Sequence, residues 1–152
     1  MRLLDSICKV IASSYIDVPI YIEEVPNQFK RSSFYVHLAT NSSNPKSYNV
    51  YQDEPIYQIV YFGKRNEANQ VVAEDLYRVQ AGLKALFLLS LAIPVIPLEG
   101  VNEKPRYAKI LSYSDDMRID EGALYVKLTL SFTEDIPHLN SYETMENIEL
   151  EI

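Results

Sequence analysis

The alternation of apolar and polar residues predicts two helices. Apolar residues recur with helical spacing over residues 3–14, and Pro19 limits any extension of that first helix. A second helix is predicted to begin at Asn66, a suitable N-cap, and to end before Pro94. Its apolar face repeats every three or four positions and consists of Ala68, Val72, Leu76, Val79, Leu83 and Leu86.

The rest of the pattern predicts strands. Residues 114–122 are expected to form a turn, and residues 41–45 a polar loop. Short turns favour an antiparallel sheet with both helices packed on one face, so the expected fold class is a single α+β domain. The predicted strands span residues 20–25, 33–39, 48–62, 95–98, 107–113 and 124–133. The last of them has the most regular alternation of apolar and polar residues.

The charge is unevenly distributed along the 152 residues, which carry a net charge of −7. Residues 134–152 contain six acidic and no basic residues, whereas residues 1–133 are nearly neutral. We therefore expect an α+β domain over 1–133 followed by an extended acidic C-terminal tail over 134–152. The chain lacks the basic footprint of a nucleic-acid-binding protein.

Candidate chemistry is sparse. His37 and His138 are isolated, and with Cys8 they provide no zinc-ligand spacing. A thiol nucleophile at Cys8 with His37 as its base would need spatial proximity and a third, orienting group, neither of which the sequence indicates. No glycine-rich phosphate loop occurs, and no apolar run is long enough to cross a membrane. We expect a protein that is not an enzyme and has no cofactor, metal or membrane partner.

Two segments resemble a known family. Residues 21–38, YIEEVPNQFKRSSFYVHL, resemble the signature of tail terminator proteins from phages and prophages of Gram-positive bacteria. The second match is a strand ending in Tyr61-Phe62 and followed by a helix near Asn66, and Met145-Glu146 give a weaker third one. The sequence departs from the family pattern at residues 27–28, where Gln-Gly is usual, and at Ser32, where proline is usual.

The resemblance implies a structural virion protein without catalytic residues. Such proteins form a ring, commonly a hexamer, that caps the tail tube, ends its polymerisation and provides the junction to the neck or connector. DNA passes through the hole without specific binding, and in a contractile tail the ring also contacts the sheath. The expected location is the head-proximal end of the virion tail, after assembly in the host cytoplasm.

A ring requires contacts between two different patches of neighbouring copies. Polar loops such as residues 41–47 and strand edges are candidates for contacts with other copies, and the uncovered, tyrosine-rich face of the sheet is a second candidate. The acidic tail is a candidate for contact with a neighbour or the tube. An alternative interpretation of the whole chain is a small ligand-binding or regulatory α+β domain, which predicts a concave apolar pocket. The candidate interface residues are Asn41, Ser42, Ser43, Asn44, Glu143, Met145 and Glu146.

Overall fold

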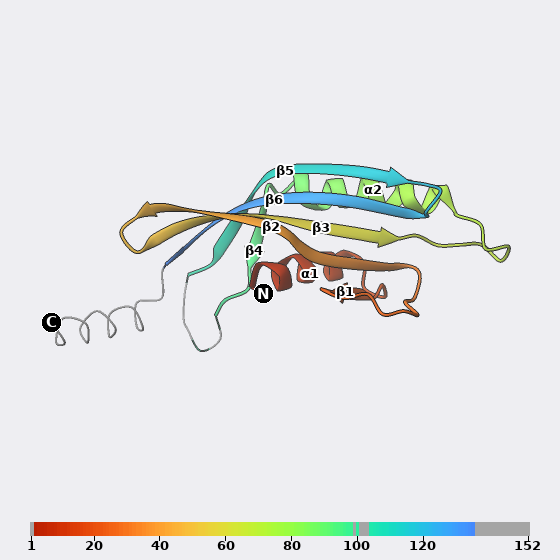
Figure 1. Cartoon of the computed structure of the whole chain (residues 1–152), viewed down its shortest axis with the longest axis horizontal. Coiled ribbons are helices and arrows are strands. Elements are labelled where there is room, and N and C mark those ends of the chain that lie inside the picture. The colour runs from red at the N-terminus through yellow and green to blue at the C-terminus, as the bar shows by residue number, and fades with distance from the viewer. Residues whose placement is uncertain (1, 99, 101–103, 136–152) are drawn as a thin grey trace.

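The computed structural model describes residues 2–98, 100 and 104–135, which form a six-stranded sheet with two helices (Figure 1). The predicted α+β class is confirmed. The elements in chain order are α1 (Arg2–Ser14), β1 (Ile20–Ile22), β2 (Ser33–Ser47), β3 (Val50–Phe62), α2 (Ala73–Leu88), β4 (Ala92–Val95), β5 (Arg106–Arg118) and β6 (Ala123–Asp135).

The sheet has the strand order β1-β2-β3-β6-β5-β4. Neighbouring strands are antiparallel except β1 and β2, which pair in parallel through Ile20–Ile22 and Phe34–Val36. The prediction of an all-antiparallel sheet is wrong at this edge. The ten residues between β1 and β2 carry the chain back along the sheet before β2 begins, whereas an antiparallel partner would need only a tight turn.

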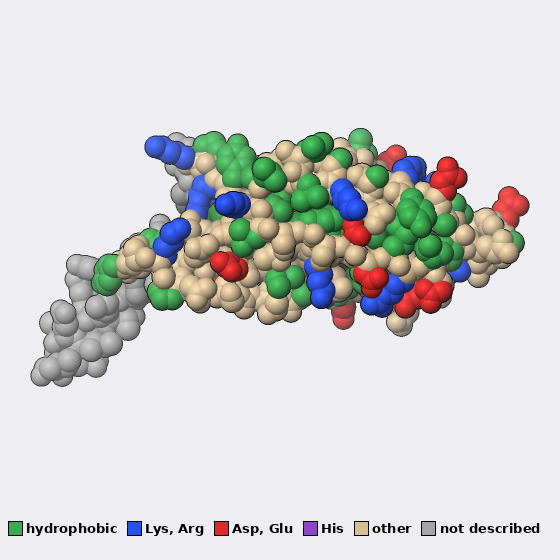
Figure 2. All heavy atoms as spheres, turned by 90° about the horizontal axis from the view of Figure 1, so that it is seen from above, with side chains coloured by type: hydrophobic (Ala, Val, Ile, Leu, Met, Phe, Trp, Pro, Cys, Tyr) green, Lys and Arg blue, Asp and Glu red, His purple; other side chains and the backbone are tan. Residues whose placement is uncertain are grey.

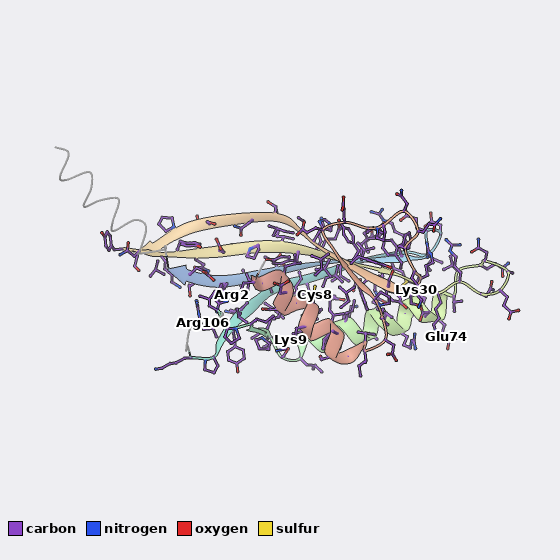
Figure 3. The ribbon with its side chains drawn as sticks, turned by 90° about the horizontal axis from the view of Figure 1, so that it is seen from below. Arg2, Cys8, Lys9, Lys30, Glu74 and Arg106 are labelled. Atoms are coloured by element: carbon purple, nitrogen blue, oxygen red, sulfur yellow. The ribbon has the colours of Figure 1, made fainter. Side chains whose placement is uncertain are left out.

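Both helices pack on one face of the sheet and share a single core (Figure 3). Alternate residues of β6, from Leu124 to Phe132, are buried against them, as the sequence pattern predicts. From α1 the core takes Leu4, Ile7 and Ile11, and from α2 it takes Leu76, Val79, Leu83 and Phe87. Because one face is covered, a one-residue slip of β6 would expose its entire apolar set.

The second helix begins seven residues later than predicted, at Ala73. Asn66 does cap a backbone N–H through its side chain, but that N–H belongs to Gln70, 2.8 Å away, within a compact loop. The Asn66 N–H also bonds the Gln70 carbonyl at 2.9 Å, which closes the loop before the helix starts. Ala68 is therefore exposed and is no part of the helical face.

The polar loop predicted at residues 41–45 is part of β2. Asn41, Ser42, Ser43 and Asn44 pair with residues 52–55 of β3, and the chain reverses at Tyr48-Asn49. Asn49 has a φ of 68°, which asparagine tolerates in a two-residue hairpin turn. Strand propensity alone misses this segment because both of its faces are polar.

Further strand boundaries differ from prediction, and β1 ends at Ile22 rather than at residue 25. β4 lies three residues earlier than expected, at Ala92–Val95. β5 extends to Arg118, so Asp115 and Asp116 lie in a strand and only residues 119–122 turn. Gly122 has a φ of 68° in that turn. β6 continues through Asp135 and thus includes the first two residues of the predicted acidic extension.

Candidate assembly interface

The distal halves of β2 and β3 form a hairpin arm, defined here as residues 39–55, that projects beyond both helices (Figure 3). Residues 39–48 are all exposed. On one face of the arm, the Ser43 hydroxyl donates to the Asp53 carboxylate, and the Asn41 amide reaches Ser43 at 3.2 Å. The arm is therefore held by its backbone ladder and by cross-strand polar pairs rather than by a core.

A hollow of about 380 Å³ lies where the arm meets the body. Leu38 and Leu98 are 43% and 49% exposed at its wall, so apolar surface faces solvent here. The remaining lining is mixed in character and consists of Arg2, Leu3, Asn41, Tyr51, Asp53, Pro55, Tyr57, Phe132 and Glu134. A shallow, mixed surface of this kind suits a protein segment better than a small apolar ligand.

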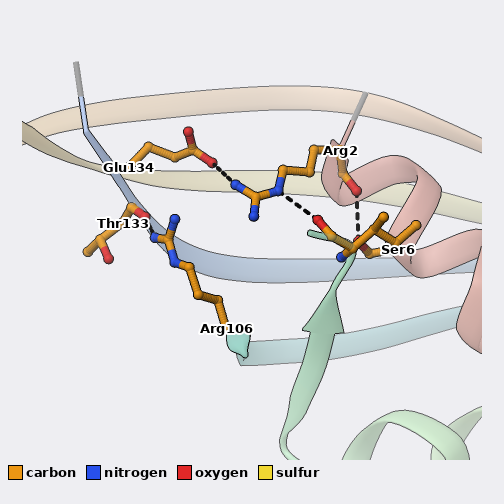
Figure 4. Close-up of polar contacts among 6 residues, drawn as sticks. Arg2, Ser6, Arg106, Thr133 and Glu134 are labelled. Atoms are coloured by element: carbon orange, nitrogen blue, oxygen red, sulfur yellow. Dashed lines mark hydrogen bonds and ion pairs between the residues drawn. The ribbon is translucent and has the colours of Figure 1, made fainter. Parts of the chain in front are cut away.

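Two arginines fix the end of β6 at the base of the arm (Figure 4). Arg2 donates to the Ile96 carbonyl at 2.8 Å and pairs with the Glu134 carboxylate at 3.3 Å. Arg106 donates to the Thr133 carbonyl, and its guanidinium lies 4.3 Å from the centre of the Phe132 ring. The Arg2 guanidinium lies 5.7 Å from the same ring centre. These contacts hold residues 132–134 to the body.

Asp75 is a buried carboxylate that the sequence pattern did not reveal. It accepts hydrogen bonds from the Tyr61 hydroxyl at 2.7 Å and the Lys64 N–H at 3.0 Å, and it pairs with Arg78. Burial acts to raise the pKa of Asp75, but these hydrogen bonds outweigh it and the pKa is lowered. Burial raises the pKa of Tyr61 to about 12, so the hydroxyl stays protonated as a donor. Through its bond to Tyr61, the Asp75 carboxylate connects the start of α2 to β3.

The described residues contain no reactive centre. Cys8 packs against the core, and burial, followed by the charge of Asp5, raises the pKa of its thiol to about 11. His37 lies on the opposite face of the sheet, bonded to Gln58 at 2.7 Å and stacked on Tyr35. The two groups therefore cannot form a nucleophile and base pair. Within the described ranges, no cluster of His, Cys, Asp or Glu is suited to a metal ion.

The predicted interface residues divide into two groups. Asn41, Ser42, Ser43 and Asn44 lie together on the arm, whereas Glu143, Met145 and Glu146 lie outside the described residues. The surface seen from above carries basic and acidic side chains interspersed, without a large field of one sign (Figure 2). In the described part of the chain, neither helix has the length and apolarity of a membrane span.

Two edges of the sheet have no strand partner among the described residues. β1 covers only Phe34–Val36 of β2, which leaves residues 39–47 of the arm uncovered on their outer side. β4 covers only Arg106–Lys109 of β5, which leaves residues 112–118 uncovered on the opposite border of the sheet. Such edges carry unpaired backbone N–H and C=O groups that can pair with another chain.

Comparison with known families decides between the two interpretations of the sequence. Residues 2–142 match the family model described as phage tail terminator protein. The chain belongs to the phage tail terminator family. A search of curated proteins found no match. The family match spans the arm, the hollow and the whole described fold, so these features are parts of a tail terminator and not of a regulatory domain.

Membership of the tail terminator family establishes the general role. The protein is a structural, non-enzymatic component of the phage tail, and it acts by capping the tail tube. Association with the tube and with further copies follows from the same membership. The expectation that the chain is not an enzyme is thus confirmed by its family. Among the described residues, the arm is exposed and the two strand edges lack a strand partner.

Proposed function

We propose that this tail terminator closes into a hexameric ring on the head-proximal end of the tail tube. One side of the ring blocks further addition of tube protein, and the other side provides the junction to the neck or connector. DNA passes through the central hole without specific binding. The interspersed charges in Figure 2 support passage without specific binding, since a strongly basic surface would retain DNA.

The exposed arm is the observation that carries this proposal. Residues 39–47 contribute nothing to the core, yet they belong to a paired strand with cross-strand contacts. A projecting element with polar faces suits the heterologous contacts of a ring, in which one patch meets a different patch on the next copy.

Electron microscopy of tail tubes with and without the purified protein tests the proposal. We expect a cap with sixfold symmetry at one end of each tube and an end to tube growth after the protein is added. Tubes that grow at the same rate with the protein present would refute the capping role. A cap with another symmetry would refute the hexamer alone.

The acidic extension is proposed to contact the tube or a neighbouring copy, because its charge makes it unsuited to packing alone. Removal of residues 136–152 leaves β6 and the Arg2 pair with Glu134 intact. We expect the shortened chain to fold normally and to attach to tubes more weakly. If the shortened chain attaches to tubes as strongly as the full chain, the extension is not part of the interface.

The finer assignments also belong to this proposal. The signature at residues 21–38 supports a phage or prophage of a Gram-positive host. If the tail is contractile, the ring also meets the last layer of sheath. The discriminating observation is the content of tail fractions that carry this protein: co-purified sheath protein supports the contractile assignment, and its absence from intact tails contradicts it.

A further inference from the structure

The two uncovered edges lie on opposite borders of one sheet, which allows the sheet of one copy to continue into the next. The arm edge, residues 39–47, belongs to β2, and the other edge, residues 112–118, belongs to β5. β2 and β5 are separated by three antiparallel steps through β3 and β6. They therefore run in opposite directions, and a second copy added in the same orientation would bring β2 beside β5 as an antiparallel pair.

The faces of the two edges also correspond. Asn41 lines the hollow with Tyr57, on the face of the sheet that carries the helices. On β5, Asp115 bonds Gln80 of α2 at 3.0 Å and so faces the same side. Ser114, next to Asp115, points to the open face. If the two edges pair, the helix-bearing face of one copy therefore continues into the helix-bearing face of the next, and the open face into the open face.

The edges are offset along the strands. Ser43, in the middle of the arm edge, pairs with Asp53 of β3, which in turn pairs with Phe132 of β6. Asp115, in the middle of the β5 edge, pairs with Val126 of β6. The offset is thus six residues of β6, or about 20 Å at roughly 3.3 Å per residue. One copy would contribute four strand spacings to the ring, three within β2, β3, β6 and β5 and one to its neighbour, or about 19 Å at roughly 4.8 Å each. An offset about equal to the width gives a strand tilt of about 45°, at the upper end of the range for closed barrels.

We propose that the arm edge of one copy pairs with the β5 edge of its neighbour, so that the sheets join around the ring into one inclined barrel. This inference rests on the proposed ring and specifies the contact that closes it. Charge permits the contact, because Lys46 is the one charged residue among 39–47, while residues 112–118 contain Asp115, Asp116 and Arg118. Pro45 lacks an N–H, and a register shift follows it, so the pairing ends before the tip.

Disulfide cross-linking tests the pairing in the full chain with Cys8 replaced by alanine. The test pair is N44C with S114C, two exposed positions on the facing edges. The control pair is N44C with K109C, because Lys109 is exposed on the same strand but lies in the part of β5 that β4 covers, where the arm of a neighbour cannot pair. Mild oxidation of the caps on tubes made from the phage's own tube protein should give a ladder of linked chains for 44–114. Each single variant should give no ladder.

The outcomes separate this inference from the proposed function. Caps that form without a 44–114 ladder, or with a 44–109 ladder instead, overturn the edge pairing and leave the ring in place. Failure to form any cap refutes the ring and the pairing together. A variant with S43P provides a second measurement, since it removes a backbone donor from the arm. We expect at least a tenfold loss of tube-bound protein for S43P with an unchanged circular dichroism spectrum, and normal binding would contradict the pairing.

Discussion

β2 is a single strand whose two halves differ in environment, whereas the distal half of β3 stays half-buried beside β6. In the half near the helices, Phe34 and Val36 are fully buried and neighbouring residues alternate between core and solvent. In the arm, residues 39–48 are all exposed and polar residues occupy both faces. The backbone ladder continues across the register shift at Ala39. The comparison teaches that strand pairing can extend well past the core, and that the extension is then available for contacts outside the monomer.

The largest change in stability is expected when a core side chain is removed. Phe34 contacts the rings of Tyr15 and Tyr61, with centroids 5.1 and 5.0 Å away. F34A should lower the free energy of unfolding by about 3–5 kcal/mol because it leaves a cavity. Y48A, at the exposed turn of the arm, should change it by less than about 0.5 kcal/mol. Urea unfolding of both variants measures the difference, and similar midpoints would contradict the division into core and arm.

The buried carboxylate should have the next largest effect. D75A leaves the Tyr61 hydroxyl and the Lys64 N–H without their acceptor. We expect a loss of about 2–3 kcal/mol, since an unsatisfied buried donor costs about 1–3 kcal/mol. E74A is the matched control, because Glu74 is exposed in the same first turn of α2. Equal losses for D75A and E74A would show that helix-dipole effects, and not the buried hydrogen bonds, account for the result.

The same group should make the packed half sensitive to acid. The folded pKa of Asp75 lies below its ordinary value of 3.8, so its stabilising contribution is complete above that value and disappears as the pH falls through the folded pKa. Between about pH 5 and pH 2.5 the wild type should therefore lose more stability than D75A. Thermal melting across this range gives both curves. Parallel curves would mean that Asp75 titrates alike in the folded and unfolded chain.

The sequence predicts the covered half of this molecule much better than the arm. Alternation in β6 and helical spacing in α1 are produced by burial on one side, so those elements were located within one or two residues. Residues 41–45 resemble a loop because no burial imposes a pattern on them. The later start of α2 depends on the contact of Asn66 with Gln70, and Asp75 depends on partners as distant as Tyr61. Such contacts leave no periodic signal in the sequence.

A small effect on stability, with the largest effect on assembly, should come from shortening the arm. Replacement of residues 43–53 with Asn-Gly closes the hairpin next to the pair of Ser42 and Glu54. It replaces eleven residues with two and removes the end of the pairing between β3 and β6, while Arg2 and Glu134 themselves are kept. We expect a loss of about 1 kcal/mol, well below that of F34A, because exposed segments contribute little to global stability.

Binding to tail tubes distinguishes the arm from a stabilising element. If the arm edge joins neighbouring copies, the shortened protein should remain folded and monomeric and should fail to cap tubes, as measured by co-sedimentation and by continued tube growth. F34A, refolded at a temperature well below its melting point, should still cap them, because its free edges are unchanged. Capping by the shortened protein would mean that neighbours meet through other surfaces. A loss of stability as large as that of F34A would mean that the two halves of β2 and β3 form one cooperative unit, which the exposure of the arm argues against.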